Sequence, residues 1–545
     1  MRPREFDALS GVTFDVLVVG GGIHGLATAF DAAGRGLSVA LIDKGDFGAA
    51  ASSNHQRTAH GGLRALQTGR LGYARDSIVE RRALARMAPR LLRPLPFMIG
   101  TYRSVTRSRL ALRAAFRLDR FLGRDRNEGV EPELHLPPAK LLSRAATLKL
   151  FPGIRQDGLT GGANWYDYQI VHSNRLTLAF AEGADSRGAR LVNHAGAVAP
   201  ITEGGRVTGM RVRDEIGWGE IDVHARLTIN AAGAHAGEIM RMFGVGRDLP
   251  LLKAMNLVTS KPASDIALAA PSPRGQMLTL TPWHGRALLG TFQSETFKQP
   301  SDLAVTHGEI DAMIADANAA FPALGLTYAD VTLVHRGIVP ARKGKDGKAV
   351  LQAAPRIHDH AREGAPGAMT VIGVKYTTAR GVGVRAAGLA ASRVAGGPGA
   401  RQKSARSIGP MVLPGAGIAD HEALAIETAG AVGLEVAPPI IRHLMSLYGD
   451  RCAAIVRLMA ERSDWRMPLV PGRLNVGAEV IHAIRSEMAG TLADIVIRRT
   501  ELGAAGYPGE DITRAAAAIA AEELEWDNDR RDREIAAVDA FYRFD

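Results

Sequence analysis

Three glycines near the N-terminus, Gly20, Gly22 and Gly25, have the spacing of a dinucleotide-binding turn. In such a turn the first glycine permits a sharp bend, the second lets the backbone approach a pyrophosphate, and the third lets the following helix pack closely on the strand. The helix N-terminus adds partial positive charge. Asp43 follows about 20 residues later, as a carboxylate that can accept a hydrogen bond from a ribose hydroxyl. The pattern predicts a site for the ADP half of a dinucleotide.

A second segment rich in small residues lies at positions 227–233. Its sequence, Leu-Thr-Ile-Asn-Ala-Ala-Gly, predicts a buried strand whose end at Gly233 permits close backbone approach to a cofactor. The alternative is an ordinary buried strand followed by a turn. Combined with the first motif, the segment favours FAD over NAD. We also expect Lys44, which directly follows Asp43, to contribute to the cofactor site.

The glycine turn lies between elements that can hold it at the end of a sheet. Residues 14–19 predict a strand, 24–35 a helix and 37–43 a parallel strand, which together make a βαβ unit. We therefore expect an α/β fold, in which a Rossmann-like FAD-binding domain is interleaved with an antiparallel-sheet substrate domain and followed by an all-α C-terminal domain. Distant segments supply further predicted strands: 206–213, 225–230, 278–280, 287–290 and 368–372.

From about Arg406 the composition changes, and the chain contains Ala- and Leu-rich stretches with few strand signals. We expect the FAD-binding and cap domains within 1–400, with the cap at roughly 85–160 and 240–345, and a helical domain at 401–545. The Gly/Pro-rich stretch 395–417 is the predicted linker. The predicted C-terminal helices include 421–433, 439–447, 478–502 and 512–526.

Composition is ordinary for a soluble protein of more than one domain. The 545 residues exceed the ~250–300 at which one core stops growing. The single cysteine, Cys452, excludes an internal disulfide and a cysteine-based metal cluster, and we predict no metal. Residues 1–14 show no signal-peptide pattern and no apolar run is long enough to span a bilayer. We expect a cytoplasmic protein whose membrane contact, where it has one, is peripheral.

Ten arginines against two aspartates lie between Arg90 and Arg126, interleaved with leucines and phenylalanines. This pattern predicts a basic amphipathic helix. Such a helix binds an anionic membrane surface, where each arginine adds about 1 kcal/mol, or it packs its apolar face on the protein. Because the aromatic residues fall on the apolar face, away from the arginines, we do not expect nucleic acid as a partner. The formal net charge of +11 does not choose between the two interpretations.

Several longer motifs occur in a fixed order along the chain. With them the chain resembles the FAD-dependent glycerol-3-phosphate dehydrogenases, the aerobic and quinone-linked family, over nearly its whole length. The motifs are 19–25 (Val-Gly-Gly-Gly-Ile-His-Gly), 31–36, 52–53, 60–64 (His-Gly-Gly-Leu-Arg), 282–283 with 290–291, 372–380 (Ile-Gly-Val-Lys-Tyr-Thr-Thr-Ala-Arg), and 478–500.

The resemblance implies oxidation of sn-glycerol 3-phosphate to dihydroxyacetone phosphate. A hydride would pass from carbon 2 to flavin N5, and the electrons would leave to a quinone. Such chemistry suits a basic pocket, because the alcohol becomes acidic as its hydride departs and the phosphate dianion needs cationic donors. The resemblance also makes the inner face of the cell membrane a candidate location, and a second copy of the chain a candidate partner.

The resemblance implies roles for individual residues. Arg64, Arg356 and Lys375 would be the catalytic and substrate-binding cations, and Thr377 would help to close the flavin site. An isolated arginine is otherwise most often a solvated surface residue, and a lone histidine is most often structural. Lining the cofactor, besides Lys375 and Thr377, would be Ser52, Ser53, His60, Gly61, Gly62 and Gly373.

The sequence departs from the family pattern in the predicted substrate pocket. Val339 stands where a substrate-facing arginine is expected, and Arg336 and Arg342 flank it as candidate substitutes. Two tyrosines of the family are replaced by alanines, so we expect a wider and less polar pocket. The remaining departures are these: Ala65 and Ala379 for tyrosines, Arg57 for a lysine, and Val374 for a glycine.

These departures leave three hypotheses. The first is a flavin-dependent dehydrogenase of glycerol 3-phosphate or of another polyol phosphate. The second is an FAD-dependent oxidoreductase of an amine or a hydroxy acid, since related folds handle such substrates. The third is a flavin-binding protein that catalyses nothing. The retained cations Arg64, Arg356 and Lys375 favour the first.

Overall fold

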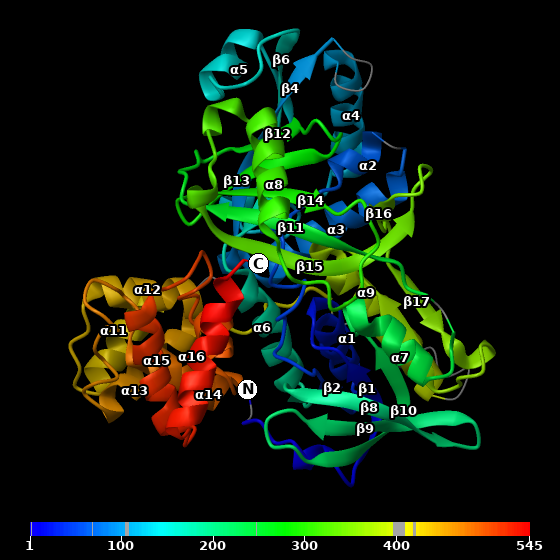
Figure 1. Cartoon of the computed structure of the whole chain (residues 1–545), viewed down its shortest axis with the longest axis vertical. Coiled ribbons are helices and arrows are strands. Elements are labelled where there is room, and N and C mark those ends of the chain that lie inside the picture. The colour runs from blue at the N-terminus through cyan, green and yellow to red at the C-terminus, as the bar shows by residue number, and fades with distance from the viewer. Residues whose placement is uncertain are drawn as a thin grey trace. The chain divides into compact units, whose positions relative to one another are not determined.

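The computed structural model describes residues 1, 3–67, 69–103, 108–246, 248–395, 409–417 and 421–544, and of Arg64, Gln67 and His421 only the backbone. These residues form two compact units (Figure 1). The first unit contains Met1–Ser53, His172–Pro250 and Gln352–Arg543, and the second contains Asn54–Val171 and Leu251–Leu351. The expected boundary between residues 400 and 401, with most of the predicted linker, lies outside the described residues.

The first unit is built on a sheet whose central strands are parallel. Its strands are β1 (Thr13–Val19), β2 (Val39–Ile42), β7 (Arg190–Val192), β8 (Ala195–Glu203), β9 (Arg206–Asp214), β10 (Glu220–Asn230), β17 (Arg356–Asp359) and β18 (Ala368–Ile372). The order is β17-β18-β10-β1-β2-β7, with β9 antiparallel to β10 and β8 antiparallel to β9. With α1 (Ile23–Gly34), β1 and β2 form the predicted βαβ unit, which is confirmed.

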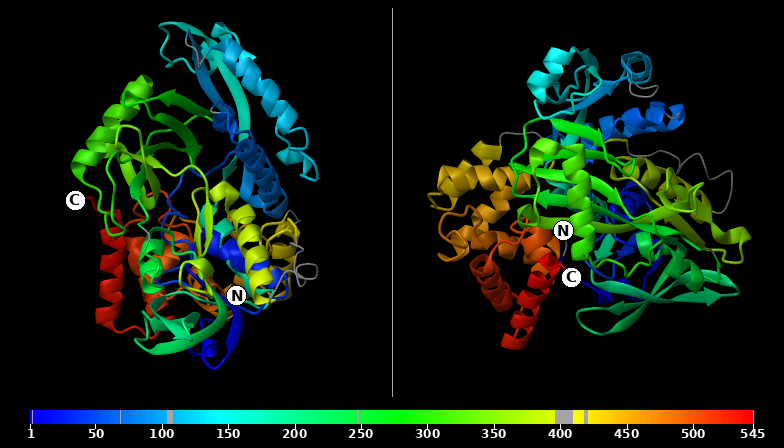
Figure 2. Two further views of the ribbon diagram at one scale, coloured as in Figure 1. Left: turned by 90° about the vertical axis from the view of Figure 1, so that its right-hand side faces the viewer. Right: turned by 45° about the horizontal axis from the view of Figure 1, so that its top comes forward.

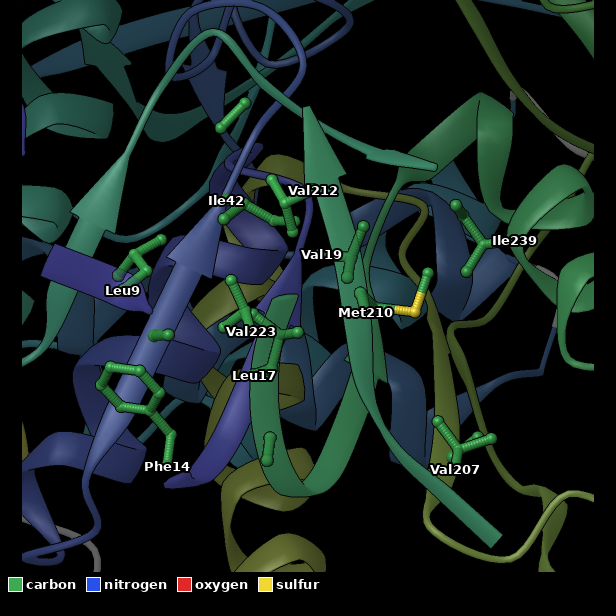
Figure 3. Close-up of a cluster of buried hydrophobic side chains, with 14 of the residues drawn as sticks. Leu9, Phe14, Leu17, Val19, Ile42, Val207, Met210, Val212, Val223 and Ile239 are labelled. Carbon is green, nitrogen blue, oxygen red and sulfur yellow. The ribbon is translucent and has the colours of Figure 1, made fainter. Parts of the chain in front are cut away.

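The parallel strands are apolar because both faces of their sheet are covered. On one face Leu17 of β1 and Ile42 of β2 pack against Met210, Val212 and Val223 of the antiparallel strands (Figure 3). The other face carries helices, which are α1, α6 (Ser173–Asp185) and α9 (Ala379–Val394), while α7 (Ala236–Met242) adds Ile239 to the cluster of Figure 3.

Helices α1 and α9 lie side by side (Figure 2). A Cβ at Gly383 of α9 would lie 2.6 Å from the carbonyl carbon of Ala27, so the glycine permits this close packing. The segment that carries residues 373–378 leads directly into α9. Helix packing therefore fixes this segment relative to the glycine turn at the start of α1.

Helices make up the C-terminal part of the first unit. They are α11 (His421–Ala431), α12 (Pro438–Tyr448), α13 (Cys452–Glu461), α14 (Gly477–Glu487), a π-helix (Asp494–Arg499), α15 (Glu510–Glu523) and α16 (Asn528–Tyr542). Their core includes Leu444, Tyr448 and Ile455. The Ala- and Leu-rich stretch 478–502 is helical as expected, but it contains two helices, α14 and the π-helix. Met488, with a φ of 58°, ends α14 in the left-handed conformation, and a turn precedes the π-helix.

The second unit is built on a mainly antiparallel sheet, ordered β16-β15-β11-β14-β13-β12-β4-β6-β3, with β5 paired to β6. Helix α8 covers one face, where Ile310 and Met313 pack on Leu257 and Val334. The strands are β3 (Thr58–Ala59), β4 (Leu92–Tyr102), β5 (Lys140–Leu142), β6 (Leu159–Ile170), β11 (Leu251–Thr259), β12 (Ala267–Pro271), β13 (Met277–Trp283), β14 (Arg286–Gln293), β15 (Val331–Lys343) and β16 (Ala349–Leu351), and the helices are α2 (Leu63–Gln67), α3 (Leu71–Met87), α4 (Arg109–Leu122), α5 (Arg144–Leu150) and α8 (His307–Ala320).

The predicted fold class is confirmed, with a Rossmann-like sheet, an antiparallel sheet and a helical C-terminal part. The arginine-rich stretch 90–126 is not one helix, because its first part is β4 and its helix is α4. Among the described residues, no helix has both the length and the apolar character that crossing a bilayer requires.

Candidate functional site

The glycine turn connects β1 to α1, and two of its glycines are required by packing. Gly20 has a φ of 112°, and a Cβ there would lie 2.5 Å from the carbonyl oxygen of Ala231. A Cβ at Gly25 would overlap the carbonyl oxygen of Gly20. At Gly22, the N-cap of α1, a Cβ would meet only the Oγ of Ser52, at 3.3 Å. The space in front of the helix N-terminus is therefore open on the side that a pyrophosphate would approach.

The two predicted serines lie close to the turn within the first unit. Ser52 Oγ accepts a hydrogen bond of 3.0 Å from the backbone nitrogen of Ile23, in the first turn of α1. Ser53 Oγ donates to the carbonyl oxygen of Gly48 at 2.6 Å. Ser52 thus satisfies one free N–H group at the end of α1 where partial positive charge is concentrated.

Asp43 lies at the C-terminal end of β2 and faces the turn. Its Oδ2 accepts from the backbone nitrogen of Gly21 at 2.6 Å, and its Oδ1 accepts from that of Gly45 at 2.8 Å. Burial raises the pKa of Asp43, while these two hydrogen bonds act in the opposite direction. Each carboxylate oxygen has a second lone pair, so Asp43 can still accept from a ribose hydroxyl.

In the first unit, Lys44 contacts the 3-10 turn that begins at Gly233. Lys44 Nζ is 3.0 Å from Nε2 of His235, in the 3-10 turn that Gly233 begins. Gly233 has a φ of 58°, and a Cβ there would meet nothing within 4 Å. Its place at the end of β10, next to β1 in the sheet, is where a cofactor running along the strand ends would pass.

His24 is a further candidate site residue, to which the sequence motifs gave no role. Its Nε2 is buried and has no hydrogen-bond partner among the described residues. Burial lowers the pKa of His24 to about 4, which keeps the imidazole neutral at pH 7. A Cβ at Gly373 would overlap the ring, so a larger residue there would have to displace His24. A buried polar atom without a partner at the glycine turn fits a polar group of a bound cofactor. In the sequence, the position of His24 inside the glycine motif at residues 20–25 could have indicated this role.

Three predicted residues lie on or beside β17 and β18 of the first unit. Arg356 is exposed and pairs in register with Ile372, the last residue of β18. Lys375 is half-buried and precedes the turn Tyr376–Thr378, in which Thr377 is buried. The antiparallel pairing therefore brings Arg356 to the chain segment that carries Gly373 and Lys375.

In the second unit, His60 and Gly61 contact a buried ion pair, and Gly62 packs against Ser77 and Ala74 of α3. The backbone nitrogen of Gly61 donates to Asp167 Oδ1 at 2.6 Å, and Arg81 pairs with the same carboxylate. A Cβ at Gly61 would overlap the Arg81 guanidinium. Although burial raises the pKa of Asp167, Arg81 and His60 hold it below its ordinary value. This constellation stabilises the loop before α2.

Arg57, noted in the sequence only as a replacement for lysine, is a buried cation of the second unit. Its guanidinium lies 4.7 Å from the centroid of the Trp283 ring, and its Nη2 lies 3.5 Å from Nε2 of His335. It has a φ of 56°. The contacts join β13 and β15, which lie far from Arg57 in the sequence. Spacing alone could not have revealed them.

The two arginines that flank Val339 lie on the face of β15 opposite to it. Val339 pairs with Leu252 and packs with it on one face of β15. Arg336 pairs with Met255, whose side chain lies on the opposite face under α8. Arg342, which is exposed, lies on the same face as Arg336 by alternation. The hypothesis that these arginines substitute at position 339 is therefore not supported within this unit.

Arg64 lies in α2, and its side chain falls outside what the structure describes. The predicted residues are divided between the units. The first unit brings together Asp43, Ser52 and the glycine turn, and pairs Arg356 with the segment before Lys375. Those in the second unit are His60, Gly61, Gly62, Arg64, Arg336 and Arg342.

Comparison with known proteins gives the same assignment over almost the whole chain. Residues 15–396 match the family model of FAD-dependent oxidoreductases, and residues 410–531 match the C-terminal domain of alpha-glycerophosphate oxidase. Glycerol-3-phosphate dehydrogenase of Synechocystis is 30% identical over 524 residues, which cover 92% of this chain and 90% of the relative. The chain belongs to the FAD-dependent glycerol-3-phosphate dehydrogenase family.

Two further relatives support this assignment. Glycerol-3-phosphate dehydrogenase 2 of Mycobacterium tuberculosis is 30% identical over 549 residues, covering 98% of this chain and 89% of the relative. The structure of the Bacillus halodurans glycerol-3-phosphate dehydrogenase, complexed with FAD, matches with a TM-score of 0.74 at 21% identity. That match covers 98% of this chain and 96% of the other, and it confirms the fold.

FAD is the cofactor of this chain, because residues 15–396 match the family model of FAD-dependent oxidoreductases. The first unit offers what the ADP half of FAD requires. Gly22 leaves open space at the N-terminus of α1, and Asp43 lies at the end of β2. His24 Nε2 is buried without a protein partner among the described residues. The residues present therefore fit the group.

Proposed function

We propose that this dehydrogenase oxidises sn-glycerol 3-phosphate to dihydroxyacetone phosphate, with hydride transfer from C2 to flavin N5 and electrons passed on to a quinone. Relatives named glycerol-3-phosphate dehydrogenase at 30% identity over nearly the whole chain support this substrate. The observation that carries the proposal in the structure is the pairing of Arg356 with Ile372. This pairing sets the backbone of Arg356 beside the end of β18, from which the chain runs through Gly373 to Lys375.

Bound FAD supplies the hydride acceptor. The protein must bind a phosphate dianion and stabilise the hydroxyl oxygen as its proton leaves, and both tasks suit fixed cations. We assign them to Arg356, Lys375 and Arg64. Arginine binds phosphate oxygens in a bidentate fashion, whereas lysine provides a compact charge that can reach a single oxygen. Thr377, buried beside Lys375, would help to close the flavin site.

Anaerobic mixing of the holoenzyme with substrate, followed by flavin absorbance, tests the proposal. Glycerol 3-phosphate should bleach the flavin, and glycerol, glycine or lactate should not. Arg356→Met should raise the concentration of glycerol 3-phosphate that half-bleaches the flavin by at least about tenfold, because a charge-assisted hydrogen bond is lost. Arg362→Met removes an exposed arginine of the same unit and serves as the matched control. If both variants bleach like the parent, the phosphate site lies elsewhere.

A longer polyol phosphate is the second candidate substrate, and the environment of Val339 favours it. The position expected to hold an arginine carries an apolar side chain that packs with Leu252 and Ala341. With Ala65 and Ala379 in place of tyrosines, the polar groups expected to hold a three-carbon substrate are fewer. Bleaching by a four- or five-carbon polyol phosphate, with no response to glycerol 3-phosphate, would assign that substrate.

For the electron acceptor we propose a membrane quinone, reached by peripheral binding at the inner face of the cell membrane. Support comes from α4, whose N-cap is Ser108 and whose buried side includes Leu112 and Phe116. On its other side Leu110 and Phe121 are 76% and 65% exposed. These two positions are eleven residues apart and share one helix face. Exposed along the same helix and just beyond it are Arg113, Arg117, Arg120 and Arg124.

An amphipathic face of this kind suits an anionic lipid surface, where apolar tips enter the headgroup region and arginines pair with phosphate. Sedimentation with vesicles tests it. The holoenzyme should pellet with phosphatidylglycerol-containing vesicles at low salt, should be released by salt, and should not pellet with pure phosphatidylcholine. Equal binding to both vesicle types would contradict the electrostatic part of the proposal.

A further inference from the structure

A buried cluster of charges joins the C-terminal helices to the sheet within the first unit. Asp46, in the loop after β2, lies among Arg498 and Arg499 of the π-helix. Asp494 of the same π-helix pairs with His194, which lies between β7 and β8. The side chains of Asp46 and Asp494 are 0% exposed, and that of Arg499 is 1% exposed.

Asp46 is held by both arginines at once. Its Oδ2 accepts from Nε of Arg498 at 2.6 Å and from Nη1 of Arg499 at 2.7 Å. Its Oδ1 accepts from Nη2 of Arg499 at 2.7 Å and from Nδ2 of Asn193 at 3.0 Å. The Arg499 contact is therefore bidentate, the arrangement that fixes a carboxylate most strongly in position and orientation.

The loop that Asp46 anchors also carries Asp43. Asp43 Oδ2 accepts from the nitrogen of Gly21 in the glycine turn, and the nitrogen of Gly48 donates to the carbonyl oxygen of Gly21 at 3.0 Å. In the sequence, Asp46 lies between Asp43 and Gly48, the two residues that make these contacts. The same loop is tied to the strand behind it, because the nitrogen of His194 donates to the carbonyl oxygen of Gly45 at 2.7 Å.

The geometry of the π-helix explains how two consecutive arginines reach one carboxylate. Single π-helical turns are rare and occur mostly at functional sites. Here the turn begins with Asp494, which also receives Arg498, so that Arg498 bridges two buried carboxylates. Arg499 is tied in addition to the carbonyl oxygen of Glu487 at 3.1 Å. Each arginine is thus held by a second group of the C-terminal part as well as by Asp46: Arg498 by Asp494, and Arg499 by the carbonyl oxygen of Glu487.

A metal ion is not the best explanation of this cluster, although Asp46, His194 and Asp494 have donor atoms within 4.8 Å of one another. Both carboxylates already accept hydrogen bonds from guanidinium groups. Two arginines in contact with the same oxygens disfavour a divalent cation by charge repulsion. The arrangement is that of a structural ion-pair network.

We propose that Arg498 and Arg499 are positioning residues for the adenosine ribose of FAD. Through Asp46 they hold the loop that presents Asp43, so that the C-terminal helices contribute to cofactor affinity without touching the cofactor. The inference rests on the proposed placement of the ribose at Asp43, and it does not depend on which substrate the enzyme oxidises.

A double-mutant cycle on the dissociation constant of FAD tests the proposal. Apoprotein is titrated with FAD in the absence of substrate, and flavin fluorescence is followed. Asp43→Ala and Arg499→Met should each raise the Kd by about tenfold or more, the effect of one lost charge-assisted hydrogen bond. Because both act on one contact, the double variant should bind no more weakly than the weaker single variant.

The matched control is Arg451→Met, which removes an arginine of the C-terminal part that pairs with the buried Glu182 of α6 at 3.2 Å, outside the loop. It should change the Kd by less than about twofold, and its effect should multiply with that of Asp43→Ala. Since removal of Arg499 leaves a buried carboxylate uncompensated, Asp46→Asn is the second variant if Arg499→Met does not fold. It should show the same coupling to Asp43→Ala.

Independent, multiplying effects of Arg499→Met and Asp43→Ala would overturn the proposal and leave the ribose placement intact. An unchanged Kd for Arg499→Met or for Asp46→Asn would also overturn it. If Asp43→Ala alone leaves the Kd unchanged, the ribose placement is wrong and the proposal fails with it. The substrate assignment is tested separately by flavin bleaching at saturating FAD.

Discussion

The guanidinium of Arg57 lies over the ring of Trp283, 4.7 Å from its centroid, inside the second unit. A planar guanidinium stacks on an aromatic face and still reaches His335, whereas an ammonium group cannot do both. We therefore predict that Arg57→Lys lowers the free energy of unfolding by about 2 kcal/mol, the upper range for a desolvated cation–π contact.

The matched control for this prediction is Arg462→Lys. Arg462 lies 4.9 Å from the centroid of Trp465, but its side chain is 39% exposed. Exposed cation–π pairs contribute about 0.5–1 kcal/mol, so its loss should be smaller. Urea unfolding of both variants gives the comparison. An equal loss would show that burial does not strengthen the Arg57 contact.

Gly25→Ala should disrupt the first unit, because its Cβ would overlap the carbonyl oxygen of Gly20. Helix α1 would have to move away from β1, at a cost of about 3 kcal/mol. Gly430→Ala is the control, since a Cβ there meets nothing within 4 Å in α11. The control should be as stable as the parent, or more stable by up to ~1 kcal/mol. Thermal unfolding of the two apoproteins measures the difference.

These glycines illustrate what the sequence could predict. The turn, α1 and β2 follow one another directly, so the spacing of Gly20, Gly25 and Asp43 can be recognised within one short stretch of sequence. Local periodicity also predicted most strands of the first sheet. The sequence did not reveal the break inside the helical stretch 478–502, because the left-handed Met488 ends α14 without interrupting the apolar pattern.

Contacts between residues far apart in the chain could not be predicted from the pattern of residue types and spacing. Asp46 and Arg499 are separated by 453 residues, and nothing local to either identifies the other. Which face of β15 lies under α8 depends likewise on the pairing of β15 with β11 and on the packing of Val334 and Met255. Such contacts are fixed by packing and register, neither of which is encoded in residue spacing alone.

Val339→Arg should increase the efficiency with glycerol 3-phosphate if the substrate pocket has lost a cation at this position. A new charge-assisted hydrogen bond to phosphate corresponds to a gain of about 10- to 100-fold in kcat/KM. Val339→Met adds bulk without charge and should not raise it. Steady-state rates with an artificial acceptor measure both variants. An increase with methionine as well would point to packing, and no increase with arginine would place the phosphate elsewhere.

Replacement of Leu110 and Phe121 together by serine should weaken binding to anionic vesicles at least about tenfold, since each buried apolar side chain contributes about 1.5–3 kcal/mol. Trp218→Ser is the control, because Trp218 is 78% exposed in the turn between β9 and β10. Flavin bleaching by substrate should be unchanged in both, as α4 lies outside the assigned cations. Loss of binding in the control alone would move the membrane contact away from α4.

The pair His194 and Asp494 should make stability depend on pH. Burial lowers the pKa of His194, but the carboxylates of Asp494 and Asp46 raise it above its ordinary value overall. A raised pKa in the folded state gives stability that is complete below about pH 6.5 and is lost as pH rises through the folded pKa. For Asp494, whose pKa is lowered, the contribution is present above about pH 4 and lost in acid.

We therefore expect His194→Gln to flatten the decline in unfolding free energy above pH 6.5, measured in urea at pH 6 to 9. His135→Gln, which removes a histidine hydrogen-bonded to the carbonyl of Val130, should leave the slope as in the parent. A parental slope in His194→Gln would show that the charged pair does not contribute to stability.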